Sequence, residues 1–166
     1  MEDATTAALV STLNAQRQHV TGILDGLDPD ALRRPVLPSR WTCLGLVQHL
    51  TLDVEEFWFQ VVMTGERPLA NSESSAWTIA PDTDPEAVLG RYREAIERAN
   101  GIAAATPLEA APVAWPGDLF GDFRLPDLRA ILLHVITETA CHAGHLDAGR
   151  ELLDERQWLV LDAGRT

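Results

Sequence analysis

Residues 125–154 read LPDLRAILLHVITETACHAGHLDAGRELLD. Apolar residues recur in this segment at spacings of three, four and seven, which predicts one long amphipathic helix. The apolar face also carries four polar side chains, those of His134, Glu138, His142 and His145. Burying such a group without a partner costs about 2–7 kcal/mol. The pattern therefore predicts that something compensates these groups, and a metal ion is the first candidate.

Two of these four residues have the spacing of metal ligands. Glu138 and His142 lie four residues apart, so one helical turn brings both side chains to a single ion. His134 sits two turns before His142, and we expect it to be an ordinary core residue. His145 is expected either to border the site or to lie outside it. Cys141 faces another direction on the helix, and we expect no role for it.

Three further helices are expected before this segment. Thr42 and Asp84 are placed to cap two of them, because their side chains accept hydrogen bonds from free backbone N–H groups. Proline, glycine and serine mark the connections, and one short helical turn is expected after Asp28. The helices are expected at 3–25, 42–63 and 84–104, and the connections at 28–42, 66–84 and 105–125.

This pattern predicts an all-α fold in which four long helices form a four-helix bundle. We expect one domain over residues 1–166. The connection 66–84 is long enough to cross the bundle, which leaves an up-down-down-up topology open. The end of the chain is expected to add a short docked element through Trp158 and Leu159.

The helix over 42–63 offers a third metal ligand. Its apolar stripe is expected to contain Leu46, Leu50, Phe57 and Val61, and His49 and Asp53 fall in the same stripe, one turn apart. His49, Glu138 and His142 would leave one open position on an ion, which is the catalytic pattern for zinc. Nickel, cobalt or ferrous iron also accept such donors.

Two further residues are candidate catalytic groups beside this site. His145 and Asp53 are both candidates for moving a proton. For Asp53 we also weigh three other roles. It orients His49 or lies at the rim of the site, and the alternative to these two is that it binds the metal.

The aromatic run 57–59 points in several directions, so one core cannot bury all three rings equally. A homodimer would cover the remainder. The alternative is that the connection 66–84 covers these rings.

The composition excludes some partners and suggests a compartment. A formal net charge of −12 argues against nucleic acid and against anionic membranes as partners. No apolar run reaches the length of about 20 residues needed to span a bilayer, and the N-terminus has no signal-peptide pattern. We expect a cytoplasmic protein in which Cys43 and Cys141 are reduced thiols.

Two motifs resemble the DinB-like superfamily. They are LGLVQHL at 44–50, followed by the aromatic run, and LLHVITETACHAGHLD at 132–147. The second is similar to the actinobacterial branch that includes mycothiol-dependent maleylpyruvate isomerase. The resemblance implies His49, Glu138 and His142 as metal ligands. Many superfamily members have Gln where this chain has His145, and we expect no counterpart of the isomerase's larger C-terminal domain.

The resemblance implies a metal-dependent enzyme, with zinc the first expectation, that uses a low-molecular-weight thiol such as mycothiol. It would catalyse S-transfer or an isomerisation on a small electrophile. Two alternatives stay open at this point. One is a metal-dependent hydrolase, and the other is a non-enzymatic bundle that binds a metal or a small molecule.

Overall fold

The computed structural model describes residues 4–66, 76–116 and 119–158. All of its elements are helices, and the described residues contain no strand, so the all-α prediction is confirmed. The elements are α1 (Ala4–Leu24), the short α2 (Pro29–Arg33), α3 (Cys43–His49), its continuation η1 (Leu50–Met63), α4 (Pro85–Ala105) and α5 (Leu128–Asp154).

The predicted caps begin these helices. The Thr42 hydroxyl accepts a hydrogen bond from the Gly45 amide at 3.0 Å, and the Asp84 carboxylate accepts one from the Glu86 amide at the same distance. Asp28 caps α2 in the same way. At α5 the helix begins three residues later than expected, because the side chain of Asp127 caps it by accepting from the Ala130 amide.

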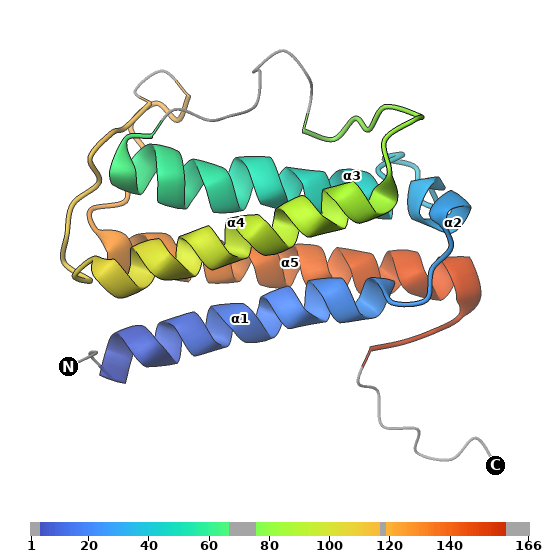
Figure 1. Cartoon of the computed structure of the whole chain (residues 1–166), viewed down its shortest axis with the longest axis horizontal. Helices are drawn as coiled ribbons and strands as arrows, with labels where there is room; N and C mark the ends of the chain where they lie inside the picture. Colours follow the sequence, from blue (N-terminus) through green and yellow to red (C-terminus); the bar gives the residue numbers. More distant parts are fainter. Residues whose placement is uncertain (1–3, 67–75, 117–118, 159–166) are drawn as a thin grey trace.

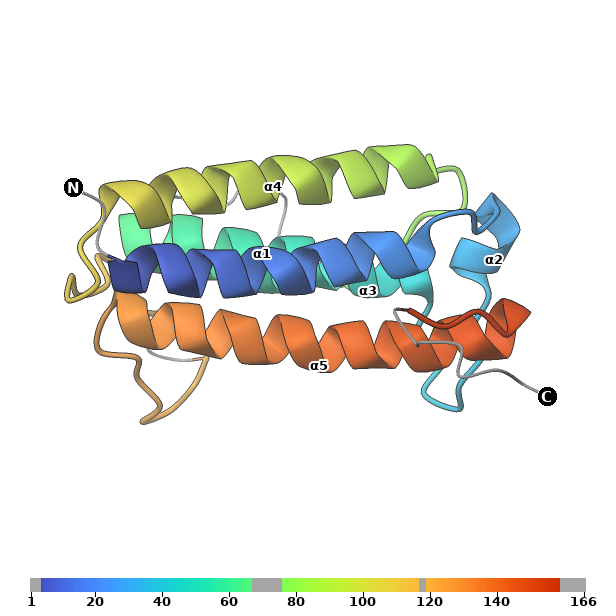
Figure 2. The same ribbon diagram turned by 90° about the horizontal axis from the view of Figure 1, so that it is seen from below.

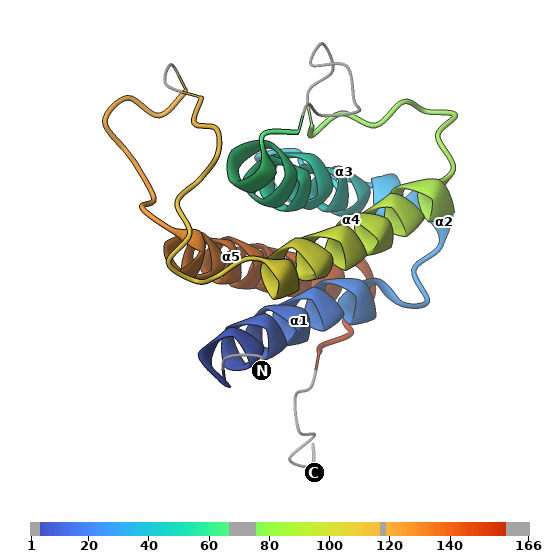
Figure 3. The same ribbon diagram turned by 60° about the vertical axis from the view of Figure 1, so that its left-hand side comes forward.

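The long helices form a bundle in which α1 packs along α5 and α4 packs along η1 (Figures 1 and 2). Figure 1 shows that α3 and η1 run opposite to α1, that α4 runs in the same direction as η1, and that α5 returns. The topology is therefore up-down-down-up, with the end of η1 and the start of α4 at opposite ends of the bundle. Figure 3 shows the same helices from nearer their ends. Within the described residues no helix is both long and apolar enough to cross a bilayer.

Directly after His49 the helix widens into a π-helix, in which each N–H bonds to the carbonyl five residues earlier. Its buried residues include Leu50, Val54, Trp58 and Val62, which recur every four positions. Residues on several sides of η1 are buried, ten of its fourteen in all, and Phe57 and Val61 are not among them. The predicted stripe through 57 and 61 is therefore wrong in this half of the helix, and both residues are only half-buried.

The aromatic run 57–59 is covered by the connection that precedes α5. The Trp58 ring lies 5.8 Å from the rings of Trp115 and Phe120, measured between centroids, and 4.7 Å from the His134 ring. Residues 76–84, the described part of the other expected cover, lie against α3 instead, where the Gln48 side chain bonds to Ala76 and Thr78. Residues 67–75 lie outside the described part. The homodimer stays a prediction.

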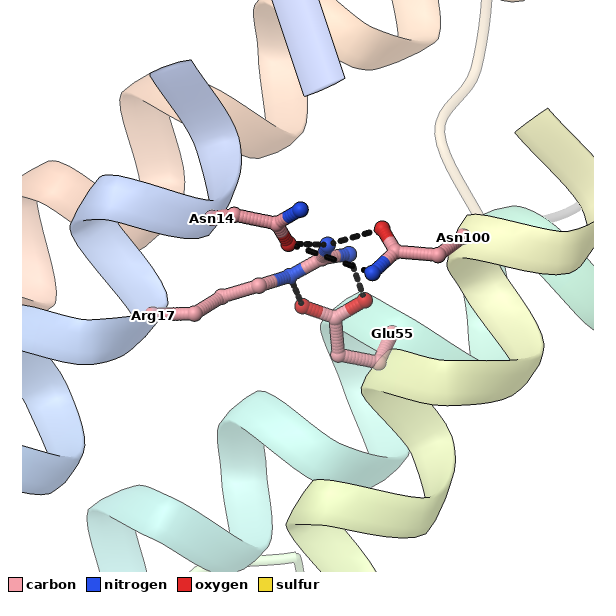
Figure 4. Close-up of polar contacts among 4 residues, drawn as sticks. All are labelled: Asn14, Arg17, Glu55 and Asn100. Atoms are coloured by element: carbon pink, nitrogen blue, oxygen red, sulfur yellow. Dashed lines mark hydrogen bonds and ion pairs between the residues drawn. The ribbon is translucent and has the colours of Figure 1, made fainter. Parts of the chain in front are cut away.

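An ion pair is buried between α1 and η1 (Figure 4). The Arg17 guanidinium donates to both carboxylate oxygens of Glu55, at 2.7 and 2.5 Å, and both side chains are almost fully buried. A third nitrogen of Arg17 donates to the amide oxygens of Asn14 and Asn100, each at 2.8 Å. Burial raises the pKa of the Glu55 carboxyl, while the charge and hydrogen bonds of Arg17 oppose that rise. This network joins three helices through groups that would be costly to bury alone.

The ion pair predicts a non-additive effect on stability. Replacing one partner, as in Arg17→Met or Glu55→Met, leaves an uncompensated buried charge and should lower the free energy of unfolding by about 3–5 kcal/mol. The double variant should lose much less, because the two apolar side chains fill a similar volume. Urea denaturation measures all three. The exposed pair Arg93 and Glu86 provides a control that should change little, and additive losses at the buried pair would contradict the prediction.

His134 predicts a pH dependence of stability. Burial lowers the pKa of its imidazole from the ordinary 6.5, although the charge of Glu138 opposes this. The unfolded chain therefore takes up a proton at this residue before the folded chain does, so stability is lost as the pH falls below about 6.5. Between about pH 7 and about pH 5 the wild type should lose more stability than His134→Gln. Urea midpoints across a pH series test this, and equal slopes would rule it out.

Candidate metal centre

Three side chains from two helices converge at the border of the bundle core. His49 is the last residue of α3, and Glu138 and His142 lie one turn apart in the middle of α5. One donor atom from each of the three lies within 4.8 Å of the other two. The imidazole rings of His49 and His142 meet edge to face, with centroids 4.9 Å apart. The structure thus brings together the residues predicted as ligands, while metal binding itself stays a prediction.

The spacing of these donors suits a shared ion. Nε2 of His142 lies 3.7 Å from a carboxylate oxygen of Glu138. Ligands that sit about 2.0–2.2 Å from zinc lie roughly 3–4 Å from one another. Two imidazoles and one carboxylate form a donor set that zinc, nickel, cobalt and ferrous iron all accept.

The centre lies at the edge of the core rather than inside it, which corrects the prediction that its polar stripe is dry. The side chain of His142 is 13% exposed, whereas that of Glu138 is 40% exposed. On α5 the fully buried positions are those of residues such as Val135, Thr139 and Leu146. His142 and Glu138 flank this buried stripe, so part of the centre faces solvent.

A hydrogen bond fixes the His49 imidazole from behind. Its Nδ1 lies 2.8 Å from a carboxylate oxygen of Asp53, one turn further along the helix. Because Asp53 accepts a hydrogen bond from Nδ1–H of His49, the other ring nitrogen, Nε2, keeps its lone pair for a ligand. The Asp53 side chain is 52% exposed, so it lies at the rim. This contact fits the orienting role that the sequence left open for Asp53.

His145 lies outside the three converging residues but next to them. It is exposed, and its Nδ1 lies 3.3 Å from Nδ1 of His142. On its other side the ring lies 6.3 Å from the Trp41 ring, measured between centroids. The catalytic role of His145 stays a prediction.

The surroundings of His142 favour the neutral form of its imidazole. Burial lowers the pKa of its imidazole, and the neighbouring rings of His49 and His145 lower it further, while the charge of Glu138 acts in the opposite direction. A neutral imidazole is the form that binds metal ions.

The remaining histidines and cysteines lie apart from the three donors. His134 packs in the aromatic cluster around Trp58. His19 lies 2.8 Å from Asp147 on the flank between α1 and α5 and stacks on Trp158, which docks the described end of the chain there. Leu159, the other residue expected in that docked element, lies outside the described residues.

Both cysteines are free thiols, as expected. Cys43 is buried, and burial raises the pKa of its thiol to about 11, so it is not a nucleophile near neutral pH. Cys141 is exposed on α5.

Sequence reasoning missed one residue at this centre. Trp77 belongs to the described end of the connection between η1 and α4, and its indole stacks on the His49 imidazole with centroids 4.2 Å apart. The connection has no periodicity that predicts such a contact. The only signal was a large aromatic residue in an otherwise small and polar stretch.

Comparison with known proteins identifies the family. No curated protein and no solved structure matches the chain. The sequence model of the Mycothiol-S-transferase family matches residues 8–155, which extend from α1 to the residue after α5 and include all three converging residues. The match confirms the resemblance to DinB-like proteins of the actinobacterial, mycothiol-related type. The chain therefore belongs to the Mycothiol-S-transferase family.

Proposed function

We propose that this protein is a metal-dependent transferase that joins a low-molecular-weight thiol, with mycothiol the first candidate, to a small electrophile. The observation that carries the proposal is the convergence of His49, Glu138 and His142 in a chain of the Mycothiol-S-transferase family. These three residues hold the ion. Zinc is the first candidate, and nickel, cobalt or ferrous iron are alternatives.

The donor set fits such an ion. Three protein ligands leave one position for a small molecule, whereas structural zinc sites usually close all four. The His49–Asp53 hydrogen bond and the lowered pKa of His142 both favour ligation through imidazole nitrogen. When bound, the ion lowers the pKa of a coordinated thiol, so that the thiolate predominates near neutral pH.

The chain's own residues orient the reactants and move the proton. His145 accepts the proton that the thiol releases and passes it to solvent, since its ring is exposed beside His142. The thiolate sulfur then forms a bond to the electrophilic carbon, and the leaving group departs with the electron pair of the broken bond. Asp53 acts through His49 as a positioning residue.

The charge of the protein favours some thiols over others. The net charge of −12 repels an anionic thiol such as glutathione. An uncharged sugar thiol such as mycothiol meets no such repulsion. Thiol preference is therefore part of the proposal.

Metal binding predicts a stability change. The purified protein should hold one divalent ion per chain, measured by elemental analysis after gentle purification, and His142→Ala should hold much less. An ion that binds only the folded chain stabilises it by mass action, so chelation should lower the melting temperature of the wild type. His142→Ala should show no further decrease on chelation. An unchanged wild-type melting curve after verified metal removal would refute the stabilising role.

Thiol-dependent turnover is the direct test of function. A panel of mycothiol, glutathione and cysteine is combined with electrophiles such as a chlorodinitroarene. The wild type should accelerate at least one pair and prefer mycothiol. His142→Ala should lose about 100-fold or more, because one of three ligands is gone. His19→Gln is the matched control, since His19 lies on the opposite flank of α5, bonded to Asp147, and it should retain activity.

The same panel separates the alternatives. Ester or amide turnover without added thiol would indicate a hydrolase. Ligand-dependent stabilisation with no turnover would indicate a binding module. If no thiol–electrophile pair reacts faster with the wild type than with His142→Ala, the transferase proposal fails.

A further inference from the structure

We propose that Trp77 is a positioning residue of the candidate metal centre, and that Gln48 and Gly45 keep its backbone segment packed against α3. In this arrangement the indole holds the His49 imidazole in the orientation in which it binds the ion. The inference rests on the proposed function, because it assigns a role toward the same ion.

The contact between the two rings is extensive. The Trp77 indole and the His49 imidazole are stacked, 18° from parallel, with centroids 4.2 Å apart. The indole also lies near His142, with ring centroids 6.0 Å apart and the two ring planes inclined by 63°. Trp77 therefore stacks on one candidate ligand and lies beside a second, and it is itself 40% exposed. Stacked aromatic rings at this distance attract each other beyond simple burial.

The backbone around Trp77 is held on α3. The side-chain amide of Gln48 donates to the carbonyl oxygens of Ala76 and Thr78, at 3.0 and 3.1 Å, and so bonds the chain on both sides of the tryptophan. Gln48 is the residue directly before His49. Gln48, which holds the Trp77 segment, and the candidate ligand His49 thus belong to the same helical turn. This couples the position of the indole to that of the imidazole.

Gly45 permits this close approach. A Cβ atom at that position would lie 2.6 Å from the Trp77 carbonyl oxygen, a distance at which the backbone must shift. Gly45 lies one turn before His49, on the side of α3 that the Trp77 segment covers. An alanine there would push the segment away without altering the indole or the ligand.

His49 needs such support. Its bond to Asp53 involves a side chain that is 52% exposed, where water competes for the carboxylate. The bond fixes which nitrogen is protonated, and the stacked indole restricts rotation of the ring. Contacts of this kind around a ligand typically change metal affinity by about 10–100-fold when removed.

The test uses two measurements on the full chain. The first is NMR of the metal-free protein, in which the stacked indole should shift the His49 ring protons upfield. The chain has five histidines, so the His49 signals can be assigned with His49→Gln. The second is calorimetric titration with zinc, and for the wild type also with nickel and with cobalt. The variants are Trp77→Ala, Trp77→Phe, Gln48→Ala and Gly45→Ala, with Gly101→Ala as control, because a Cβ at Gly101 meets nothing within 4 Å.

The expected result is a common effect of the three disruptive changes. Trp77→Ala, Gln48→Ala and Gly45→Ala should move the His49 signals and weaken zinc binding, with about a 10-fold loss or more for Trp77→Ala. Trp77→Phe should restore most of the affinity because it keeps an aromatic face, and Gly101→Ala should match the wild type. Gln48→Ala and Gly45→Ala keep the test valid if Trp77→Ala fails to fold.

Three outcomes would overturn the inference. Unchanged His49 signals in Trp77→Ala would show that the rings do not stack, whether or not zinc binds. Changed signals with unchanged zinc affinity would remove the positioning role and leave the proposed function intact. If the wild type binds no zinc, nickel or cobalt, both the positioning role and the proposed function fail. This outcome is distinguished from a failure of the positioning role alone because it is measured on the wild type, without the variants.

Discussion

The change of helical turn at Leu50 is the constraint on which the arrangement of this bundle depends. Up to His49 the chain follows an α-helix, and from Leu50 it follows the wider turn of a π-helix. Ten of the fourteen residues of this π-helix are buried, Glu55 among them. One continuous helix thus places His49 against α5, Glu55 against α1 and Trp58 against the connection before α5. π-Helical segments are rare and are often found at functional sites, and here the segment begins at the residue after a candidate ligand.

Polar side chains are paired with one another in the core but leave donor atoms open at the candidate centre. In the core, Arg17 and Glu55 satisfy each other completely, with Asn14 and Asn100 closing the network. At the centre, His49, Glu138 and His142 converge without satisfying one another, and each keeps a donor atom directed to a common region. A closed network contributes to a specific helix arrangement, whereas an open set of lone pairs is suited to a ligand. The difference in exposure fits these two roles.

The candidate ligands lie on helices, and the aromatic side chains beside them come from connecting segments. The donors come from α3 and α5, which the core holds in place, so their spacing does not depend on a flexible loop. Trp77 and Trp41 come from the segments that precede α4 and α3, and they lie next to His49 and His145 at the two ends of the row of imidazoles. Family members with the same helices and other residues in these segments would keep the donors and change what approaches them.

The sequence by itself determined the parts of this protein that depend on local spacing. The four long helices, the caps at Thr42 and Asp84, and the one-turn spacing of Glu138 and His142 all follow from contacts within a few residues. The tertiary structure alone decided the rest. The ion pair of Arg17 with Glu55 joins residues 38 positions apart, and the stacking of Trp77 on His49 joins residues 28 positions apart. Both contacts, and the wider turn after His49, depend on how whole helices and connections pack. A helical period specifies which face a residue occupies, but only packing against other segments decides what that face meets.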